Sequence, residues 1–143
     1  MDPTVVEAAF KAAERFFDLP YEEKVAVSIL HSNKLRGYTG LLEENTDPDN
    51  AGDLHEAFDI GLELAPNDPD ADGDTYGWGR NQWPDLDGFR SDVLAYYDAM
   101  RALCDRLYRA FALSLDLDED FFTAKMRKPI GELRLLLHRL QYH

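Results

Sequence analysis

Three aspartates at alternate positions form the first group of residues whose spacing could do chemistry. Asp68, Asp70 and Asp72 precede Gly73, which matches the opening of an EF-hand calcium loop. An EF-hand also needs a bidentate glutamate at its twelfth position, where this chain has Gly79, and a helix on each side of the loop. The pattern therefore favours a solvated acidic loop, and a calcium-binding acidic module is the least favoured functional hypothesis.

The histidines give no recognised metal-binding motif. A site with two histidines and one carboxylate usually begins with H-x-D or H-x-E, because ligands two residues apart on a strand point to the same side. Neither that spacing nor H-E-x-x-H occurs at any of the four histidines, which are His31, His55, His138 and His143. We therefore predict no metal ligand and interpret each histidine as a surface or hydrogen-bonded structural residue.

The motifs of nucleophilic and phosphate chemistry are also missing, since no G-x-S-x-G, P-loop or G-x-G-x-x-G occurs. Cys104, the only cysteine, falls on the apolar side of a predicted helix, where we expect it to pack as a small hydrophobe. No catalytic residue is predicted. Arg36 and Tyr38, close to Glu43 and Glu44, could line a polar pocket, because a guanidinium binds carboxylates in a bidentate manner. A surface loop in which Arg36 pairs locally with a glutamate explains the same residues equally well.

Composition limits the remaining classes of function. The 143 residues carry a net charge of −13, which would repel the phosphates of nucleic acid. No apolar run approaches the ~20 residues of a membrane span, and the N-terminus shows no signal segment. A single cysteine excludes an intrachain disulfide and a cysteine-based zinc site. We therefore expect one domain, residues 1–143, in a cytoplasmic protein without a nucleic-acid or membrane partner.

Two helices are predicted near the N-terminus. Asp2 and Pro3 are typical of a helix N-cap and a first helical position, and apolar residues then recur at helical spacing as far as Phe17. Pro20 opens a second helix, which we expect to end near residues 31–33. Residues 33–54 are predicted to be loops with an extended piece at 36–39, residues 55–60 a short strand, and residues 62–85 an acidic Gly/Pro-rich loop.

The clearest predicted element is a helix over residues 86–115. Its apolar residues step by three or four positions: Phe89, Val93, Tyr96, Met100, Leu103, Leu107, Phe111 and Leu115. The run 133–140 fits a strand and a helix equally well. Together these patterns predict a mainly α fold, a small helical domain built around the 86–115 helix and the first two helices, with minor extended segments.

Five short stretches in order are more informative than any motif alone. They are FFDLPYEEK at 16–24, RGY at 36–38, EAFDIG at 56–61, NQWP at 81–84 and GFR at 88–90. At these spacings they resemble the isopenicillin N synthase-like iron(II)/2-oxoglutarate-dependent dioxygenases over most of residues 4–136. The resemblance is to the helical non-haem dioxygenase N-terminal region, which precedes the catalytic double-stranded β-helix of the family.

The resemblance implies cofactors that this chain would not bind alone. Members of the family hold iron(II) with H-x-D and a distant histidine, and they anchor 2-oxoglutarate with an Arg-x-Ser pair. We expect those residues beyond position 143 and the double-stranded β-helix core to be lacking, so we interpret the chain as truncated at both ends. No cofactor bound by this chain is therefore expected, although the full-length family uses iron(II) and 2-oxoglutarate.

The same resemblance implies residues near a substrate. The family lines its substrate pocket with the R-G-Y segment and the loop after it, which corresponds to Arg36, Tyr38, Glu43 and Thr46. Arg134 matches a position on the first core strand that can face the cosubstrate pocket. In an alternative interpretation, Arg36 and Tyr38 only brace their loop.

Two further functional hypotheses follow from the resemblance. In the first, the chain is the N-terminal, substrate-shaping region of an oxidoreductase that acts on a small molecule, and it performs no turnover alone. In the second, it is a non-catalytic, truncated paralogue whose exposed apolar surface makes it dimerise or bind a partner.

Overall fold

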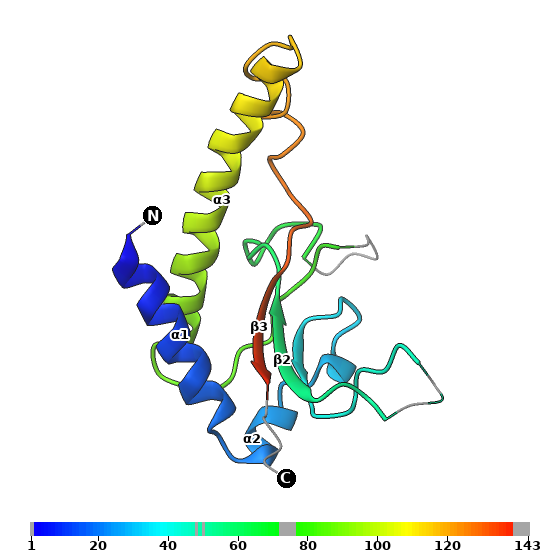
Figure 1. Cartoon of the computed structure of the whole chain (residues 1–143). Helices are drawn as coiled ribbons and strands as arrows, with labels where there is room; N and C mark the ends of the chain where they lie inside the picture. The colour runs from blue at the N-terminus through cyan, green and yellow to red at the C-terminus, as the bar shows by residue number, and fades with distance from the viewer. Residues whose placement is uncertain (1, 48, 50, 72–76, 139–143) are drawn as a thin grey trace.

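The computed structural model describes residues 2–47, 49, 51–71 and 77–138. In chain order, its elements are the helices α1 (Pro3–Phe17) and α2 (Tyr21–Val25), the 3₁₀ helix η1 (Ile29–His31), the strands β1 (Gly37–Thr39) and β2 (His55–Ile60), the long helix α3 (Phe89–Ser114) and the strand β3 (Leu133–His138). Figure 1 shows α1 and α3 together on one side of the sheet, with α3 projecting well beyond it. Within the described ranges, no helix combines the length and apolar character that a membrane crossing requires.

Helix α1 begins as the sequence predicts. The Asp2 side chain accepts a hydrogen bond from the Thr4 backbone N–H at 2.9 Å, and Pro3 occupies the first turn, where its missing N–H costs nothing. The helix buries one face, made of Ala9, Ala12, Phe16 and Phe17. This face packs toward the sheet and gives the molecule its first layer.

The second predicted helix is shorter than expected. Helix α2 ends at Val25, and η1 forms in the segment where the helix was predicted to continue. The Val27 carbonyl accepts the Tyr38 N–H at 2.8 Å, and the Ser28 hydroxyl accepts the Leu30 N–H at 3.2 Å. Contact with β1 therefore interrupts the helix, which local periodicity could not show.

Helix α3 confirms the helix predicted over residues 86–115, although it begins three residues later and ends one residue earlier. It follows Gly88, whose φ of 73° lies in the left-handed region that favours glycine. The first half of α3 buries Phe89, Val93 and Tyr97, whereas most of the second half is exposed.

The prediction of a mainly α fold is wrong, because a three-stranded antiparallel sheet forms a whole layer of the molecule. The strand order is β1-β2-β3, and all six residues of β3 pair with β2, from Leu133 opposite Ile60 to His138 opposite His55. The ambiguous 133–140 run is thus a strand over residues 133–138, while its last two residues lie outside the described ones. Pairing with β2, which lies far earlier in the chain, makes this segment a strand. Sequence periodicity alone carries no information on that partner strand.

Aromatic rings fill the space between the helices and the sheet. The ring centroid of Phe16 lies 4.7 Å from that of Phe58 and 5.1 Å from that of Phe89, distances at which aromatic pairs attract. Trp83 packs at the edge of this cluster, 6.2 Å from Phe89, and its indole N–H donates to Glu63 at 3.4 Å. Trp83 therefore anchors the chain by packing just ahead of α3.

Two side-chain amides tie the end of the acidic 62–85 loop to the rest of the fold. Asn81 Oδ1 accepts the Gly61 N–H at 2.8 Å, and Asn81 Nδ2 donates to the Gly61 carbonyl at 3.0 Å. Gln82 Nε2 donates to the carbonyls of Ser28 and Arg36 at 2.8 and 2.6 Å. These contacts fix the point at which the loop returns to the sheet.

Candidate functional site

The sheet has two chemically different faces. Leu133, Leu135 and Leu137 of β3 pack with Phe58 and Ile60 of β2 toward the helices. Successive residues of a strand point to opposite sides, so their neighbours occupy the other side. We call that side the polar face; it consists of His55, Ala57 and Asp59 on β2 and of Arg134, Leu136 and His138 on β3. The alternation therefore gathers charged groups where the helices do not reach.

Arg134 organises the polar face. Its Nε donates to Asp59 Oδ1 at 2.8 Å and its Nη2 to Asp59 Oδ2 at 3.1 Å, while Nη1 donates to both Glu44 oxygens at 3.0 and 2.9 Å. Glu44 belongs to the loop between β1 and β2, so one guanidinium links two strands and a loop. The hydrogen bonds from Arg134 and His55 lower the pKa of Glu44, whereas burial raises the pKa of Asp59 despite its bond to Arg134.

A group of possible metal ligands adjoins this network. Glu44, Asp53 and His55 each present one ligand atom, and these atoms all lie within 4.8 Å of one another. His55 Nε2 is 2.9 Å from Glu44 Oε2, and the His55 ring stands edge-on to that of His138, with centroids 5.6 Å apart. Glu44 and His55 are half-buried, and Asp53 is exposed.

A buried ionic cluster occupies the opposite, helix-facing side. Lys24 Nζ donates to Glu56 Oε2 at 2.5 Å and to the Phe17 carbonyl at 3.0 Å, and the Tyr38 hydroxyl donates to the same Glu56 oxygen at 2.8 Å. Lys24, Tyr38 and Glu56 are each at most 4% exposed. Burial, followed by the bond to Glu56, raises the pKa of Tyr38, so its hydroxyl stays protonated and remains a donor.

Arg36 is buried elsewhere, although it lies only two residues before Tyr38. Its Nη1 forms an ion pair with Glu132, and its Nη2 donates to the Gly77 carbonyl at 3.0 Å. Its Nε has no hydrogen-bond partner among the described residues. Gly61 packs directly against the guanidinium, where a side chain would collide with it. Arg36 thus joins β1 to the segments that precede α3 and β3.

The structure separates the residues that the resemblance placed near a substrate. Arg36 and Tyr38 point into different parts of the interior, and both are at most 2% exposed. Glu43 is exposed at the start of the following loop, where its carboxylate accepts the Gly40 N–H at 2.7 Å, and Thr46 is exposed further along. Arg134 alone lies on the polar face.

Sequence reasoning missed the partners that hold Arg134 and Tyr38. Glu56 and Asp59 stand in the EAFDIG stretch, whose alternation predicts that they face opposite sides of a strand. That signal could have identified two buried carboxylates, but it could not have identified their cations. Lys24 lies 32 residues before Glu56, and Arg134 lies 75 residues after Asp59, so each cation is far from its partner in the sequence.

A lysine occupies the described part of the calcium-like loop. Lys128 Nζ lies 2.9 Å from Asp68 Oδ1 and 2.6 Å from Asp70 Oδ2, so an internal cation bridges these two carboxylates. The next residues of the pattern, Asp72 and Gly73, lie outside the described residues. The contact with Lys128 ties the acidic loop to the segment before β3.

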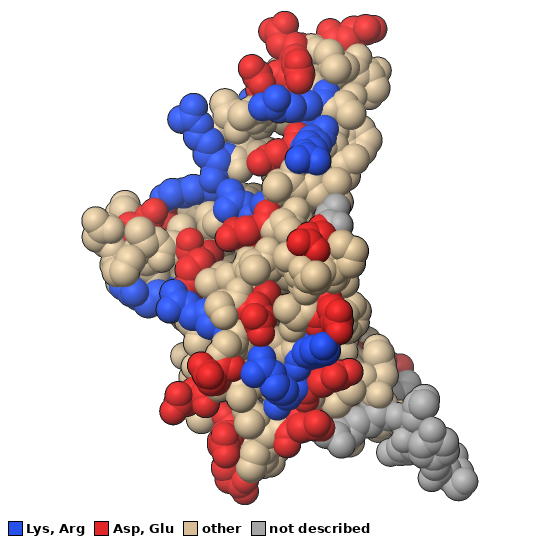
Figure 2. Space-filling view, turned by 90° about the vertical axis from the view of Figure 1, so that its left-hand side faces the viewer, with Lys and Arg blue, Asp and Glu red and all other residues tan. Residues whose placement is uncertain are grey.

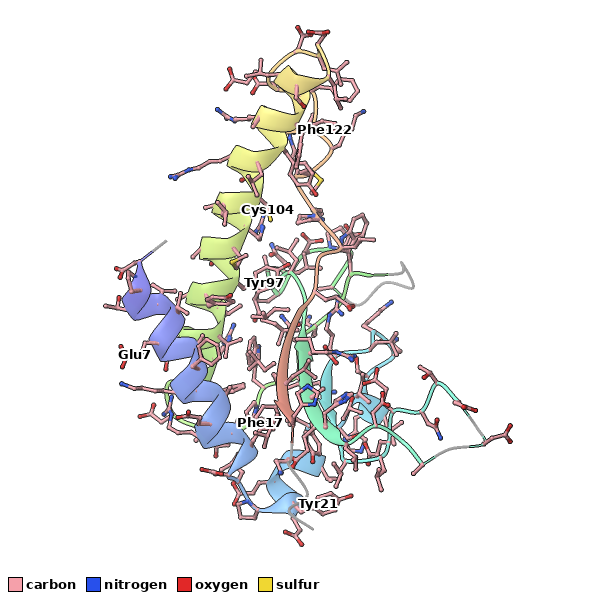
Figure 3. All side chains as sticks on the ribbon, in the orientation of Figure 1. Glu7, Phe17, Tyr21, Tyr97, Cys104 and Phe122 are labelled. Atoms are coloured by element: carbon pink, nitrogen blue, oxygen red, sulfur yellow. The ribbon has the colours of Figure 1, made fainter. Side chains whose placement is uncertain are left out.

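A cavity lies between the middle of α3 and the chain that returns to β3, and Lys128 and Glu132 are among the residues that line it. Its volume is about 650 Å³, and aromatic and sulfur-containing side chains, including Tyr97, Met100 and Tyr108, line much of it. Figure 3 shows Tyr97 and Cys104 on α3 and Phe122 near the far end of this region. Contrary to the sequence prediction, Cys104 is exposed on the cavity wall and is not packed in the core.

The helix side of the molecule shows no patch of a single charge. In Figure 2, acidic and basic side chains are interspersed with uncharged surface over α1 and α3. Arg15, for example, lies 3.1 Å from Asp92 and joins the two helices. The charged groups on this side therefore serve local pairing.

Curated relatives share the chain's sequence over most of its length. It is 36% identical over 121 residues to azadirone synthase of Melia azedarach. The aligned region covers 82% of this chain and 35% of that protein. It is 33% identical over 129 residues to a 2-oxoglutarate-Fe(II) type oxidoreductase of Emericella nidulans, which covers 87% of this chain and 37% of that protein. The chain thus spans little more than a third of the length of these relatives.

Solved structures share its fold. A 2OG-Fe(II) oxygenase family protein from Caulobacter crescentus matches with a TM-score of 0.79 and 28% identity, over 95% of this chain and 43% of that one. A Neurospora crassa protein, solved at full length in complex with alpha-KG and thymine, matches with a TM-score of 0.71 and 28% identity, over 95% of this chain and 42% of that one. Residues 1–86 match the family described as non-haem dioxygenase in morphine synthesis N-terminal. The chain therefore belongs to the 2-oxoglutarate/iron(II)-dependent dioxygenases and corresponds to their N-terminal region.

Proposed function

We propose that this chain is the substrate-shaping N-terminal region of an iron(II)/2-oxoglutarate-dependent oxidoreductase and performs no turnover by itself. The observation that carries the proposal is the position of β3. Among the described strands it is one of the two outer ones, it is paired with β2 along one edge only, and it places Arg134 on the polar face. An unpaired strand edge can accept a further strand, so the sheet is built to continue into another part of an enzyme.

The chain's own residues do not fit the iron site of the family. That site uses H-x-D with a distant histidine, and H-x-D occurs nowhere in the 143 residues. The possible ligand group at Glu44, Asp53 and His55 has a different order and contains a single histidine. We therefore assign no step of iron or oxygen chemistry to this chain.

Its contribution to a substrate pocket would be positional. Buried Arg36 and Tyr38 hold β1 in place through partners on several segments. Glu43 and Thr46, which are exposed in the loop after β1, are then the residues able to contact a small molecule. Arg134 would present a positive charge beside that loop, because its guanidinium also holds Glu44.

The test is turnover of 2-oxoglutarate. The purified chain is incubated with iron(II), ascorbate, oxygen and 2-oxoglutarate, and succinate is measured against a blank without protein and an active oxygenase. We expect succinate at the level of the blank. Formation of succinate that depends on the chain would contradict the proposal.

A second candidate function, self-association, rests on α3. Its second half exposes an apolar stripe at Leu103, Leu107, Phe111 and Leu115, which are 40, 47, 56 and 62% exposed. These residues recur at helical spacing, so they share one side of α3 and continue the stripe that the core buries in its first half. An unpaired stripe of this kind is typical of an interaction surface.

Sedimentation distinguishes the two candidates. Self-association predicts a dimer or larger species that Leu107→Glu returns to a monomer. Ala102→Glu is the matched control, because Ala102 is exposed five residues away and therefore lies outside the stripe. A monomer at high concentration before any substitution would rule this candidate out.

A further inference from the structure

We propose that Glu44, Asp53 and His55 bind a divalent transition metal of the zinc type. The site is separate from the iron site of the family, and it does not depend on the function proposed above. It arises where the loop between β1 and β2 closes onto the first residue of β2.

The backbone holds the ligands in place before any metal arrives. The Leu42 N–H donates to the Asp53 carbonyl at 3.0 Å, and the Asp53 N–H donates to the Glu44 carbonyl at 2.7 Å. These two bonds close the loop between its ends and place both carboxylates beside His55. A ligand set that is positioned by the fold loses less conformational entropy on binding than one on a free loop.

The spacing suits a small ion. The ligand atoms lie within 4.8 Å of one another, and the closest pair, His55 Nε2 and Glu44 Oε2, is 2.9 Å apart. A zinc ion takes ligands at about 2.0–2.2 Å, so two of its ligands stand roughly 3.3 Å apart in a tetrahedral site. Small rotations of the exposed Asp53 side chain would bring the third ligand into this range.

The imidazole of His55 selects the class of metal, and a second imidazole stands nearby. His138 is paired with His55 across the strands, and their ring centroids are 5.6 Å apart. Imidazole together with carboxylate is a donor set for zinc and similar ions, whereas calcium and magnesium prefer oxygen ligands alone. The His55 imidazole thus favours a transition metal and disfavours calcium at this position.

The surrounding charges also favour a dication. Glu44, Asp53 and Asp59 bring three carboxylates to this corner of the polar face, against the single guanidinium of Arg134. Arg134 donates to both oxygens of Glu44 and so fixes the orientation of a ligand, as outer hydrogen-bond partners do in metal sites. Its positive charge also opposes the metal, so we expect moderate affinity.

The experiment is a calorimetric titration of the metal-free chain with zinc chloride. We expect one site in the micromolar range, a rise in the thermal midpoint with added zinc, and no effect of calcium chloride. Asp53→Asn should weaken binding by at least the roughly 10–100-fold that loss of an outer-shell partner of a ligand costs. Because Asp53 is exposed, the variant should keep its circular dichroism spectrum and its midpoint without metal.

Two controls separate this site from adventitious binding. Asp49→Asn makes the same change of charge in the same loop, and His31→Gln removes an exposed histidine elsewhere, so both should leave the affinity unchanged. His55→Gln should abolish the tetrahedral absorption bands of bound cobalt(II). The inference is overturned if zinc does not bind, or if Asp53→Asn and His55→Gln bind as tightly as the unchanged chain. Neither result bears on the succinate assay.

Discussion

Arg134 and Asp59 lie directly opposite each other on β3 and β2 and are joined by two parallel hydrogen bonds of 2.8 and 3.1 Å. Asp59 is 2% exposed, so its charge depends on this one guanidinium for compensation. The pair therefore couples the strand that ends the described part of the chain to the centre of the sheet.

Replacement of Arg134 should destabilise the fold. Arg134→Met leaves the buried Asp59 carboxylate without its cation, and we expect a loss of about 2–3 kcal/mol. This value is below the usual cost for a fully buried pair because the Arg134 side chain is itself 39% exposed. Urea unfolding measures the change, with Arg106→Met on the exposed side of α3 as the control. Equal effects of the two substitutions would show that the pairing contributes nothing.

Loss of the cation from the buried Lys24–Glu56–Tyr38 cluster should destabilise the fold more than loss of Arg134. Lys24→Met removes a buried cation that hydrogen-bonds Glu56 at 2.5 Å, and a loss of about 3–5 kcal/mol is expected. The double variant Lys24→Met/Glu56→Gln should recover part of this loss, because it also removes the buried negative charge that Lys24 pairs with. Lys11→Met supplies the control, since Lys11 pairs with Glu7 at a site where both side chains are about two-thirds exposed. Additive losses in the double variant would argue against a coupled pair.

The acid sensitivity of the fold should depend on Glu44. Its folded pKa is lowered, so its stabilising contribution is present above the unfolded value of about 4.3 and is lost as the pH falls through the folded pKa. Glu44→Gln should therefore lower the thermal midpoint at neutral pH and have little effect at a pH of about 3. The raised pKa of Asp59 has the opposite effect on stability. Protonation of this buried carboxylate as the pH falls removes a buried charge and so favours the folded state.

Thermal midpoints of both proteins across this pH range check the prediction. In Glu44→Gln, acidification should cost less stability than in the unchanged chain. A midpoint difference that stays constant from neutral pH to about 3 would mean that Glu44 does not titrate with a shifted pKa.

Gly61 should tolerate no side chain. A methyl group there would overlap the buried guanidinium of Arg36, which is held by Glu132 and the Gly77 carbonyl and cannot easily move. We expect Gly61→Ala to cost about 1–3 kcal/mol, the usual cost of overpacking. Gly131→Ala is the matched control, because no described residue other than its two chain neighbours lies within 4 Å of the position its side chain would take. Chemical denaturation compares the two, and a stable Gly61→Ala variant would mean that Arg36 is free to shift.

Local sequence signals correctly predicted the elements that show a clear pattern among neighbouring residues. The N-cap at Asp2 and the long helix depend on neighbours within a few residues, and the strand at 55–60 shows a local alternation although it pairs with β1 and β3. Each was predicted close to its observed bounds. The fold class was mistaken because β3 needs a partner strand. A run of leucines at 133–137 satisfies both a helical and a strand pattern until β2 supplies hydrogen-bond partners along one edge.

The candidate site was harder to predict for the same reason. Arg134 was chosen from the resemblance, but its carboxylate partners lie 75 and 90 residues earlier in the chain. The metal-ligand group escaped notice because Glu44 and Asp53 approach His55 only after the loop closes. The spacing of a sequence motif identifies ligands that lie on one element. It cannot identify a group whose ligands come from both a loop and a strand.

The paired contacts between Asn81 and Gly61 have a consequence for how this region can vary. The Asn81 amide presents a donor and an acceptor to one residue's backbone, as a neighbouring strand would, so it ends the sheet without adding a strand. The hydrogen bonds from the Asn81 side chain hold the two ends of the segment between Gly61 and Asn81 together, whatever the length of that segment. Changes of length within residues 64–79 should therefore be tolerated where they keep Asn81 at the exit and spare the Gly77 carbonyl that holds Arg36 and the Asp68 and Asp70 carboxylates that pair with Lys128. Aspartate in place of Asn81 would repel the Gly61 carbonyl.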